Sequence, residues 1–322
     1  MTKLPSFFLI FLVSFFLLGA IPELDAQQLP LFTQYREYHS ILNPATINSD
    51  YFTHEYNVSF GASYRVQWDA QSFTPRTQVA RFEYLFTEGK QAGLILGGHV
   101  INDQVGPMGT TGASVRTGVL LSDDPDWWGL VGSLSVGLTQ FRINKNKIES
   151  YDPLLNQCDC QSIRPDLGIG LFAYKRFSRG FFDQDVIYGG LSIPQVLAFD
   201  PVFITEESET TFSRVAHYYG LAGLYKQLAD YKFFETSLWV KYVPNAPVNV
   251  DVNVRYAPVE YFWIGIGYAS SKTFHFELGF LLGENIGWDN TMRLGYGIDR
   301  GINAYGPIFG LSHEVNISYA LE

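Results

Sequence analysis

Cysteine, charge and long hydrophobic runs are all scarce in this sequence. Only two cysteines occur, Cys158 and Cys160, which excludes a disulfide framework and a cysteine-rich zinc site. Charged residues make up 17% of the chain, against about a quarter in an ordinary soluble protein. The net charge of −10 lacks the basic excess of a nucleic-acid-binding protein, so we expect no nucleic-acid partner. Beyond Ala26 no apolar run approaches the roughly 18 residues of a transmembrane helix.

Motifs for catalysis and cofactor binding are missing as well. The sequence holds no G-x-S-x-G, Walker A, H-E-x-x-H or complete G-x-G-x-x-G motif, and its histidines are scattered. The pairs Gly265/Gly267 and Gly295/Gly297 lack a third glycine and lie inside predicted strands, where glycine permits barrel curvature. The sequence therefore predicts a protein that is not an enzyme, with no catalytic, cofactor-binding or metal-binding residues and no cofactor.

The N-terminus has the pattern of a secretory signal peptide. Lys3 supplies the positive charge, residues 7–18 are apolar apart from Ser14, and Ala26 is a small residue at the cleavage point. An uncleaved anchor is the alternative, although the apolar stretch is short for a membrane span. We therefore divide the chain into a signal peptide at 1–26, a periplasmic lead-in segment at 27–53 and a β-barrel at 54–322.

What the sequence has in abundance is aromatic residues, glycine and a two-residue alternation of apolar and polar side chains. Aromatics reach 16%, and stretches such as 56–68 and 248–256 alternate strictly. Strands of this length match tilted membrane-crossing strands. The fold class is predicted as all-β, a transmembrane antiparallel up-and-down barrel; a large soluble β-protein is the alternative. We expect fourteen strands near 54–68, 76–87, 91–102, 109–121, 128–144, 165–177, 184–194, 212–227, 231–243, 246–257, 261–271, 273–284, 289–299 and 312–321.

The predicted links between strands alternate between short and long. Short links such as 87–91 and 228–230 are even-numbered, whereas the long links 145–164, 195–211 and 300–311 are odd-numbered. Bacterial outer-membrane barrels have short periplasmic turns and long outer loops. We therefore expect an outer-membrane location, in contact with its lipid, with both termini in the periplasm and the long loops outside.

Charged residues of both signs fall on the inward face of the predicted strands. If these side chains faced lipid instead, each charge would destabilise the barrel by a few kcal/mol near the membrane midplane. The pattern therefore predicts a wet or ion-paired lumen. The residues are Arg65, Arg81, Glu83, Arg116, Lys241, Asp251, Arg255, Glu277, Arg293 and Asp299.

Nine segments carry a family resemblance that covers essentially the whole mature chain. They are 27–35 (QQLPLFTQY), 42–45 (LNPA), 64–68 (YRVQW), 101–107 (INDQVGP) with 111–112 (TG), 151–153 (YDP), 165–170 (PDLGIG), 188–192 (YGGLS), 296–299 (YGID) and 312–319 (SHEVNISY). In this order they resemble the PorP/SprF family of the type IX secretion system. The resemblance implies a barrel that assists secretion or surface anchoring of a cargo protein with a C-terminal sorting domain, such as a gliding adhesin.

The partners that the resemblance implies are that secreted surface protein and periplasmic components of the same system. The alternative function is a diffusion channel or a transporter of hydrophobic compounds, which fourteen strands also suit. Residues 27–50 are expected to plug the lumen, to dock a periplasmic partner or to form a strap at the barrel rim.

Two sets of residues are candidates for binding the partner. Exposed apolar groups rimmed by charge often mark interfaces, and the two longest outer loops contain such groups. A stiff turn is expected where Gly-Pro follows Asn-Asp, because these residues favour turns. The alternatives are loops that fold inward as lids and a turn without a partner. The candidates are Tyr151, Leu154, Phe199 and Phe203 in the loops, and Asn102, Asp103, Gly106 and Pro107 in the hairpin.

Overall fold

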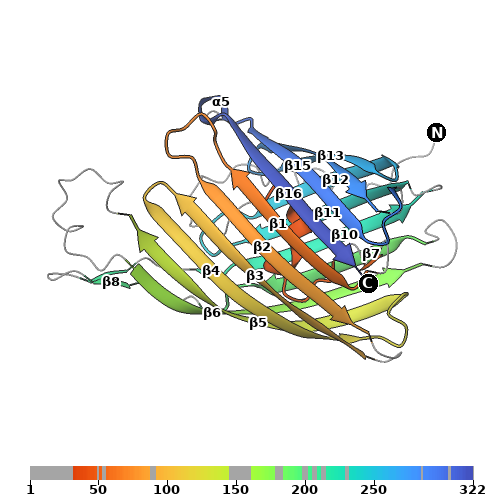
Figure 1. The fold of residues 1–322 in the computed structure, drawn as a ribbon. Helices are drawn as coiled ribbons and strands as arrows, with labels where there is room; N and C mark the ends of the chain where they lie inside the picture. Colours follow the sequence, from red (N-terminus) through yellow and green to blue (C-terminus); the bar gives the residue numbers. More distant parts are fainter. Residues whose placement is uncertain are drawn as a thin grey trace, which may run out of the picture.

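The computed structural model describes residues 32–48, 51–52, 56–87, 92–144, 161–177, 184–197, 202–204, 209–211, 215–228, 232–283, 286–303 and 306–321. Fourteen strands form one closed antiparallel barrel, which is sealed by the pairing of β1 with β16 (Figure 1). The predicted strand number and fold class are confirmed. Among the described residues, no helix has the length and apolar character needed to cross a bilayer.

The strands follow each other around the barrel in chain order. In that order they are β1 (Val58–Val66), β2 (Arg76–Phe86), β3 (Ala92–Val105), β4 (Met108–Leu121), β5 (Trp128–Ile143), β6 (Gln161–Arg176), β7 (Val186–Ile193), β10 (Tyr218–Gln227), β11 (Phe233–Tyr242), β12 (Asn249–Val259), β13 (Phe262–Ala269), β14 (Thr273–Leu282), β15 (Thr291–Gly301) and β16 (Leu311–Leu321). Every predicted strand corresponds to one of these, with shifts of a few residues at the ends.

Burial alternates along the strands with a period of two, as the sequence pattern predicts. In β2 the residues at every second position from Thr77 to Leu85 are buried, and most of the residues between them are exposed. In β14 the exposed positions are Phe274, Phe276, Leu278 and Phe280. Side chains of successive strand residues point to opposite faces, so the exposed apolar set forms an outer surface suited to lipid.

The barrel wall is much taller on one side. Strands β3 to β6 have 14 to 16 residues, whereas the other barrel strands have 8 to 11. Strand β6 pairs with β5 from Gln161 onward but with β7 only from Ile169. Leu167 still accepts a hydrogen bond from Val196 N at 2.6 Å on the β7 side. The backbone of Pro165 faces the same side but has no N–H to donate, so the hydrogen-bond ladder between β6 and β7 does not extend to it.

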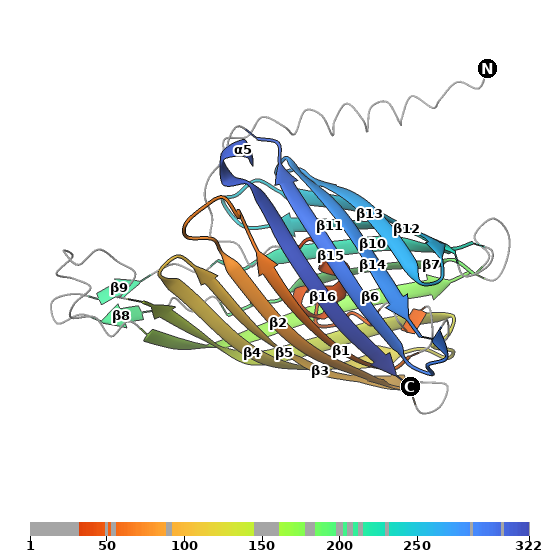
Figure 2. The same ribbon diagram turned by 45° about the horizontal axis from the view of Figure 1, so that its top comes forward.

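The two ends of the barrel differ. At one end, here called the short-turn end, β1 begins and β16 finishes; the opposite, long-loop end carries the links before β6, β10 and β16. A small hairpin of β8 (Val202–Ile204) and β9 (Glu209–Thr211) lies in the link before β10, which was predicted as a plain loop (Figure 2). Helix α5 (Gly306–Phe309) lies in the last link, where Phe309 stacks on Trp68.

The N-terminal segment lies inside the barrel. It contains the short helices η1 (Tyr35–Tyr38) and α2 (His39–Leu42), which appear within the ring of strands in Figures 1 and 2. Of the alternatives left open for residues 27–50, the described part, 32–48, takes that of a lumen plug. We call residues 32–48 and 51–52 the plug.

Candidate functional site

The plug runs along the lumen from the long-loop end to the short-turn end. Phe32 lines a cavity together with Trp68 and Phe309, which belong to the long-loop end. Twenty residues later, the Phe52 carbonyl accepts a hydrogen bond from Arg176 Nη2 at 3.0 Å, at the last residue of β6. Phe32, the first described residue, therefore lies at the opposite end of the barrel from Leu321, and the expected periplasmic position of the N-terminus falls outside the described residues.

The centre of the plug is a pair of adjacent buried charges, Arg36 and Glu37. Glu37 faces three arginines of the wall: its carboxylate lies 3.6 Å from Arg81, 3.6 Å from Arg255 and 3.9 Å from Arg293. Arg36 pairs with Glu277 and, at 3.6 Å, with Glu235. Buried charges of this kind are stable only when paired, so the plug and the wall neutralise one another.

Before this centre, the chain is held by acidic residues of the last two strands. The backbone N–H groups of Thr33 and Gln34 donate to Glu314 at 2.8 and 3.0 Å, and Thr33 Oγ1 donates to Asp299 at 2.8 Å. Gly295 and Gly297 face this stretch, and an added Cβ would collide with Gln34 or Thr33. These two glycines therefore permit the close approach of the plug, a role that the sequence did not predict, and the barrel curvature expected of them stays a prediction.

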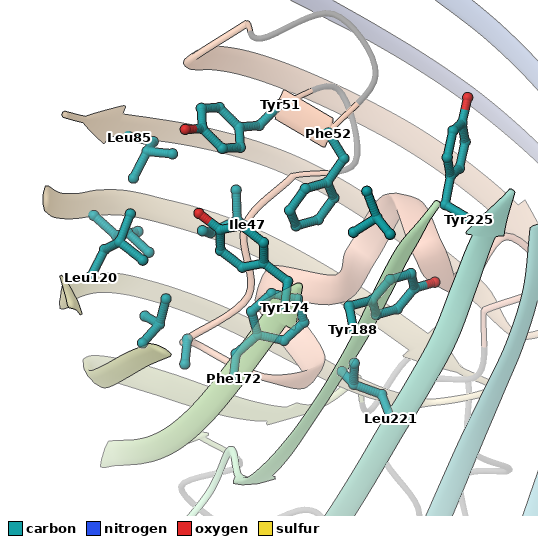
Figure 3. Close-up of a cluster of buried hydrophobic side chains, with 14 residues drawn as sticks. Ile47, Tyr51, Phe52, Leu85, Leu120, Phe172, Tyr174, Tyr188, Leu221 and Tyr225 are labelled. Carbon is teal, nitrogen blue, oxygen red and sulfur yellow. The ribbon is translucent and has the colours of Figure 1, made fainter. Parts of the chain in front are cut away.

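After the centre, backbone and apolar contacts hold the plug. Arg116 Nη1 donates to the carbonyls of Pro44 and Thr46 at 2.6 and 2.8 Å, and Ser192 Oγ donates to Leu42 O at 2.7 Å. Phe52 lies in an aromatic cluster on the wall, with a ring-centroid distance of 4.9 Å to Tyr174 (Figure 3). The remaining cluster residues include Ile47, Tyr51, Leu85, Leu120, Phe172, Tyr188, Leu221 and Tyr225.

Burial and charge shift the pKa values of two plug residues. Burial alone would raise the pKa of Glu37, but Arg293, Arg255 and Arg81 outweigh it and hold that pKa below its ordinary value. Burial lowers the pKa of His39 to about 4, because the loss of water by its cation outweighs the attraction of the Glu235, Glu37 and Glu83 carboxylates. At neutral pH the plug therefore holds a charged Glu37 and a neutral His39.

All ten inward charges predicted from the sequence are buried in the lumen, which is ion-paired. Sequence reasoning missed Glu235 and Glu314 on the wall and the role of Arg36 and Glu37 in the plug. The sequence did contain a signal for the two wall residues, since Glu235 and Glu314 occupy inward positions in strands whose apolar and polar residues alternate. An Arg-Glu pair among aromatic residues is also unusual in an exposed lead-in.

Two cavities lie beside the plug near the long-loop end. The larger has a volume of about 430 Å³ and lies between the plug and β3 to β6; we call it the cup. The smaller, of about 220 Å³, lies on the other side of Phe32 and is lined by Lys241, Asp251 and His275. Within the described residues, no group of three or more His, Cys, Asp or Glu side chains could hold a metal ion.

The four candidate residues of the predicted hairpin occupy different positions in the structure. Gly106 and Pro107 form the two-residue turn between paired Val105 and Met108, and Gly106 has φ +58°, which glycine adopts without strain. Asn102 and Asp103 lie within β3, so they do not initiate the turn. Asn102 is exposed on the outer face, and Asp103 lines the cup.

The predicted loop residues are less well placed. Tyr151, Leu154 and Phe199 lie outside the described residues, as do Cys158 and Cys160. Phe203 belongs to β8, whose side chains are not described. These four candidate binding residues therefore stay predictions.

Comparison with known proteins gives both a family and a fold. Residues 24–319 match the family described as "Type IX secretion system membrane protein PorP/SprF". The barrel is similar to a TodX monoaromatic hydrocarbon channel deltaS2 mutant, with a TM-score of 0.51, 9% identity, and coverage of 87% of this chain and 93% of that one. It is also similar to a CymD monoaromatic hydrocarbon channel, with a TM-score of 0.50, 10% identity, and coverage of 92% of this chain and 94% of that one. At such identities the likeness shows the fold alone. No curated protein matches the sequence significantly.

Proposed function

The chain belongs to the PorP/SprF family of type IX secretion system membrane proteins, and from this premise we propose that it assists secretion or surface anchoring of a partner protein. The partner is a cargo of the same system with a C-terminal sorting domain, of the gliding-adhesin type. The protein is an outer-membrane β-barrel. In this role the barrel holds its partner and does not conduct it.

The observation that carries the proposal is the closed lumen. The plug crosses the lumen and is fastened by buried ion pairs on Arg36 and Glu37. Removing one partner from such a pair costs about 3–5 kcal/mol, so each buried charge of the wall favours the seated plug. A folded cargo therefore has no path through this barrel, and contact at the barrel surface remains.

We place the long-loop end outside the cell and the short-turn end in the periplasm. The rule that bacterial barrels have short periplasmic turns supports this orientation. It puts the Phe32 end of the plug toward the cell surface and Leu321 toward the periplasm. Exposed Phe73 marks the long-loop end, and Gly287 marks the short-turn end.

Cysteine labelling tests the orientation. In a background with Cys158 and Cys160 replaced by serine, Phe73→Cys should react with a large polyethylene-glycol maleimide on intact cells. Gly287→Cys should react only after the outer membrane is opened. The reverse pattern would show that the long loops face the periplasm.

A deletion strain tests the function. Loss of the gene should lower the amount of one large surface protein, while other type IX cargo is still exported, and the intact gene should restore it. Loss of all type IX export would point to a core component of the machine. An unchanged surface proteome would contradict the proposal.

The partner contacts stay to be located. The predicted loops 145–164 and 195–211 are one candidate surface, and Phe199→Ser with Phe203→Ser should release the partner while the barrel still assembles. Normal retention of the partner by this double variant would place the contact elsewhere at the long-loop end.

A diffusion channel or hydrophobic-compound transporter is the second candidate. The likeness in fold to monoaromatic hydrocarbon channels and the cup favour it. Planar-bilayer recordings separate the two functions. The purified barrel should give no stable conductance if the plug stays seated, whereas a steady open pore would favour transport.

A further inference from the structure

The cup is a dead end that opens toward the long loops. Its floor is formed by Ser40, Ile41 and Leu42 of the plug, with Arg116 beside them. Arg116 is itself tied to the plug backbone and to Glu83 at 3.1 Å, so it closes the base. A molecule that enters from the long-loop end must leave by the same way. The cup is therefore shaped for binding and not for passage.

Small inward residues hollow the cup out. Gly112, Gly137 and Gly168 occupy neighbouring strands, and Ser114 and Ser135 lie beside them. A Cβ on Gly137 would lie 2.5 Å from Ala113 O, and one on Gly168 would lie 2.6 Å from Pro194 O. Tall strands with small inward side chains thus leave a volume of about 430 Å³, within the range of ligand pockets.

The chemistry of the cup is mixed. Its upper wall is largely apolar, and Asp103 projects into it as a half-buried carboxylate. A second carboxylate, Asp166, also lines the cup and accepts a hydrogen bond from Gln195 Nε2 at 3.1 Å. Asp103 Oδ1 accepts a hydrogen bond from Thr77 Oγ1 at 2.6 Å, but within the described part of the chain it forms no ion pair. The acids of the lumen that hold the plug do have basic partners, so Asp103 differs from them. The apolar wall residues are Phe32, Ile41, Ile101, Val105, Met108 and Phe141.

We propose that the cup receives a lysine or arginine side chain presented by an extended segment of the secreted partner. The methylene stem of such a residue packs on the apolar wall, and its cationic head reaches Asp103, as long basic side chains do at apolar surfaces. A charge-assisted hydrogen bond to a partly buried carboxylate is stronger than a neutral one. This proposal rests on the proposed function and names the contact by which the barrel holds its partner.

Other occupants fit less well. An acidic group would meet the carboxylate of Asp103, and an uncharged apolar compound would leave that carboxylate without a counter-charge in an apolar wall. The floor formed by the plug excludes a ligand in transit. Charge complementarity therefore selects a cation on an apolar stem.

The test uses the full-length barrel in detergent micelles and three blocked, fluorescently labelled tripeptides. Their sequences are Leu-X-Leu, where X is lysine, norleucine or glutamate. The lysine peptide should bind about tenfold more tightly than the norleucine peptide, and the glutamate peptide should bind weakest. Equal affinities for lysine and norleucine would overturn the assignment of a cation.

Three variants locate the binding. Asp103→Asn keeps an acceptor for Thr77 and should abolish the preference for lysine over norleucine. Ser114→Trp should fill the cup and abolish binding of all three peptides. Val115→Trp places the same side chain on the outer face, where Val115 is 68% exposed, and should leave binding unchanged. Peptide binding that survives Ser114→Trp would show that the site lies outside the cup.

The same variants in cells keep the two proposals distinguishable. If Asp103→Asn and Ser114→Trp bind peptides as expected but still retain the surface partner, the cup is a site but not the anchoring contact, and the inference fails. If deletion of the whole gene leaves the surface proteome unchanged, the proposed function fails. If the surface partner is lost in Asp103→Asn and in Ser114→Trp but not in Val115→Trp, the result supports the proposed function and the inference about the cup.

Discussion

The lumen of this barrel has two unlike halves. On the side of β1, β2 and β11 to β16, inward positions carry charged side chains that pair with each other and with Arg36 and Glu37 of the plug. On the side of β3 to β7 and β10, most inward positions are apolar near the short-turn end and many are glycine or serine near the long-loop end, with charged exceptions such as Arg116 and Asp103. The first half holds the smaller cavity of about 220 Å³, whereas the second is packed near the short-turn end and holds the cup of about 430 Å³ near the long-loop end.

The difference shows that one closed sheet can perform two tasks. Buried charges fix the plug in a single register, because each charge is costly unless its partner is in place. Inward glycine and serine residues expose little apolar surface to the lumen, and their small size leaves space beside the plug. The ionic half therefore determines where the plug sits, and the hollow half determines what else the lumen can hold.

The ionic half should be most sensitive to the loss of one charge. Glu37→Gln leaves Arg81, Arg255 and Arg293 without their shared carboxylate, at a cost of about 3–5 kcal/mol. We expect the plug to loosen and a measurable conductance to appear in planar bilayers. Glu260→Gln, the same change in the turn before β13, is the control and should stay closed. A closed Glu37→Gln barrel would show that the ion pairs do not hold the plug.

The second-largest effect is expected in the apolar cluster around Phe52, in the other half of the lumen. Phe52→Ala removes a buried ring from the cluster with Tyr174 and should lower the stability by about 3 kcal/mol. Guanidinium titration, read as the folded fraction on a semi-native gel, measures this change. Phe73→Ala, at a residue that is 63% exposed, should change the midpoint little. Similar midpoints for the two variants would mean that the aromatic cluster contributes nothing to anchoring.

Acid should weaken the plug through His39. The pKa of His39 is about 4 with the plug seated, against an ordinary value of about 6.5, so protons bind better to the released segment. Stability is therefore complete above pH 6.5 and declines as the pH falls toward 4, by about 2 kcal/mol at pH 5. The lowered pKa of Glu37 adds a loss of the same sign at still lower pH.

Hydrogen exchange of the plug peptides at pH 7 and pH 5, corrected for intrinsic rates, measures this effect. His39→Gln should remove the difference between the two pH values. A wild-type plug that is equally protected at both values would contradict the assigned charge states.

The smallest effect is expected from adding volume to the cup. Thr110→Leu fills part of an empty space and should change stability by no more than about 0.5 kcal/mol. Gly295→Ala, in the ionic half, adds a single methyl where Gln34 already lies and should cost about 1–3 kcal/mol. Thermal unfolding of both variants is the measurement. If Thr110→Leu is as harmful as Gly295→Ala, the cup is not a cavity in solution.

The strand pattern was readable from the sequence because a barrel wall has lipid on one face and the lumen on the other. Phe274, Phe276 and Phe280 point outward, while His275 and Glu277 point inward, and this alternation sets the strand and its register. For the same reason, the inward charges were assigned correctly. The β8–β9 hairpin was missed because such short strands carry too little alternation to stand out from a loop.

The sequence by itself determined the barrel, its fourteen strands and the sidedness of its charges, since alternation is a local property of each strand. Only the tertiary structure decided the path of the plug and the place of the cup. Arg36 and Glu37 find their partners on β2, β11, β12, β14 and β15, more than forty residues away along the chain. No local pattern encodes which distant charges will meet, because that depends on the closure of the sheet, which brings opposite walls to either side of one segment.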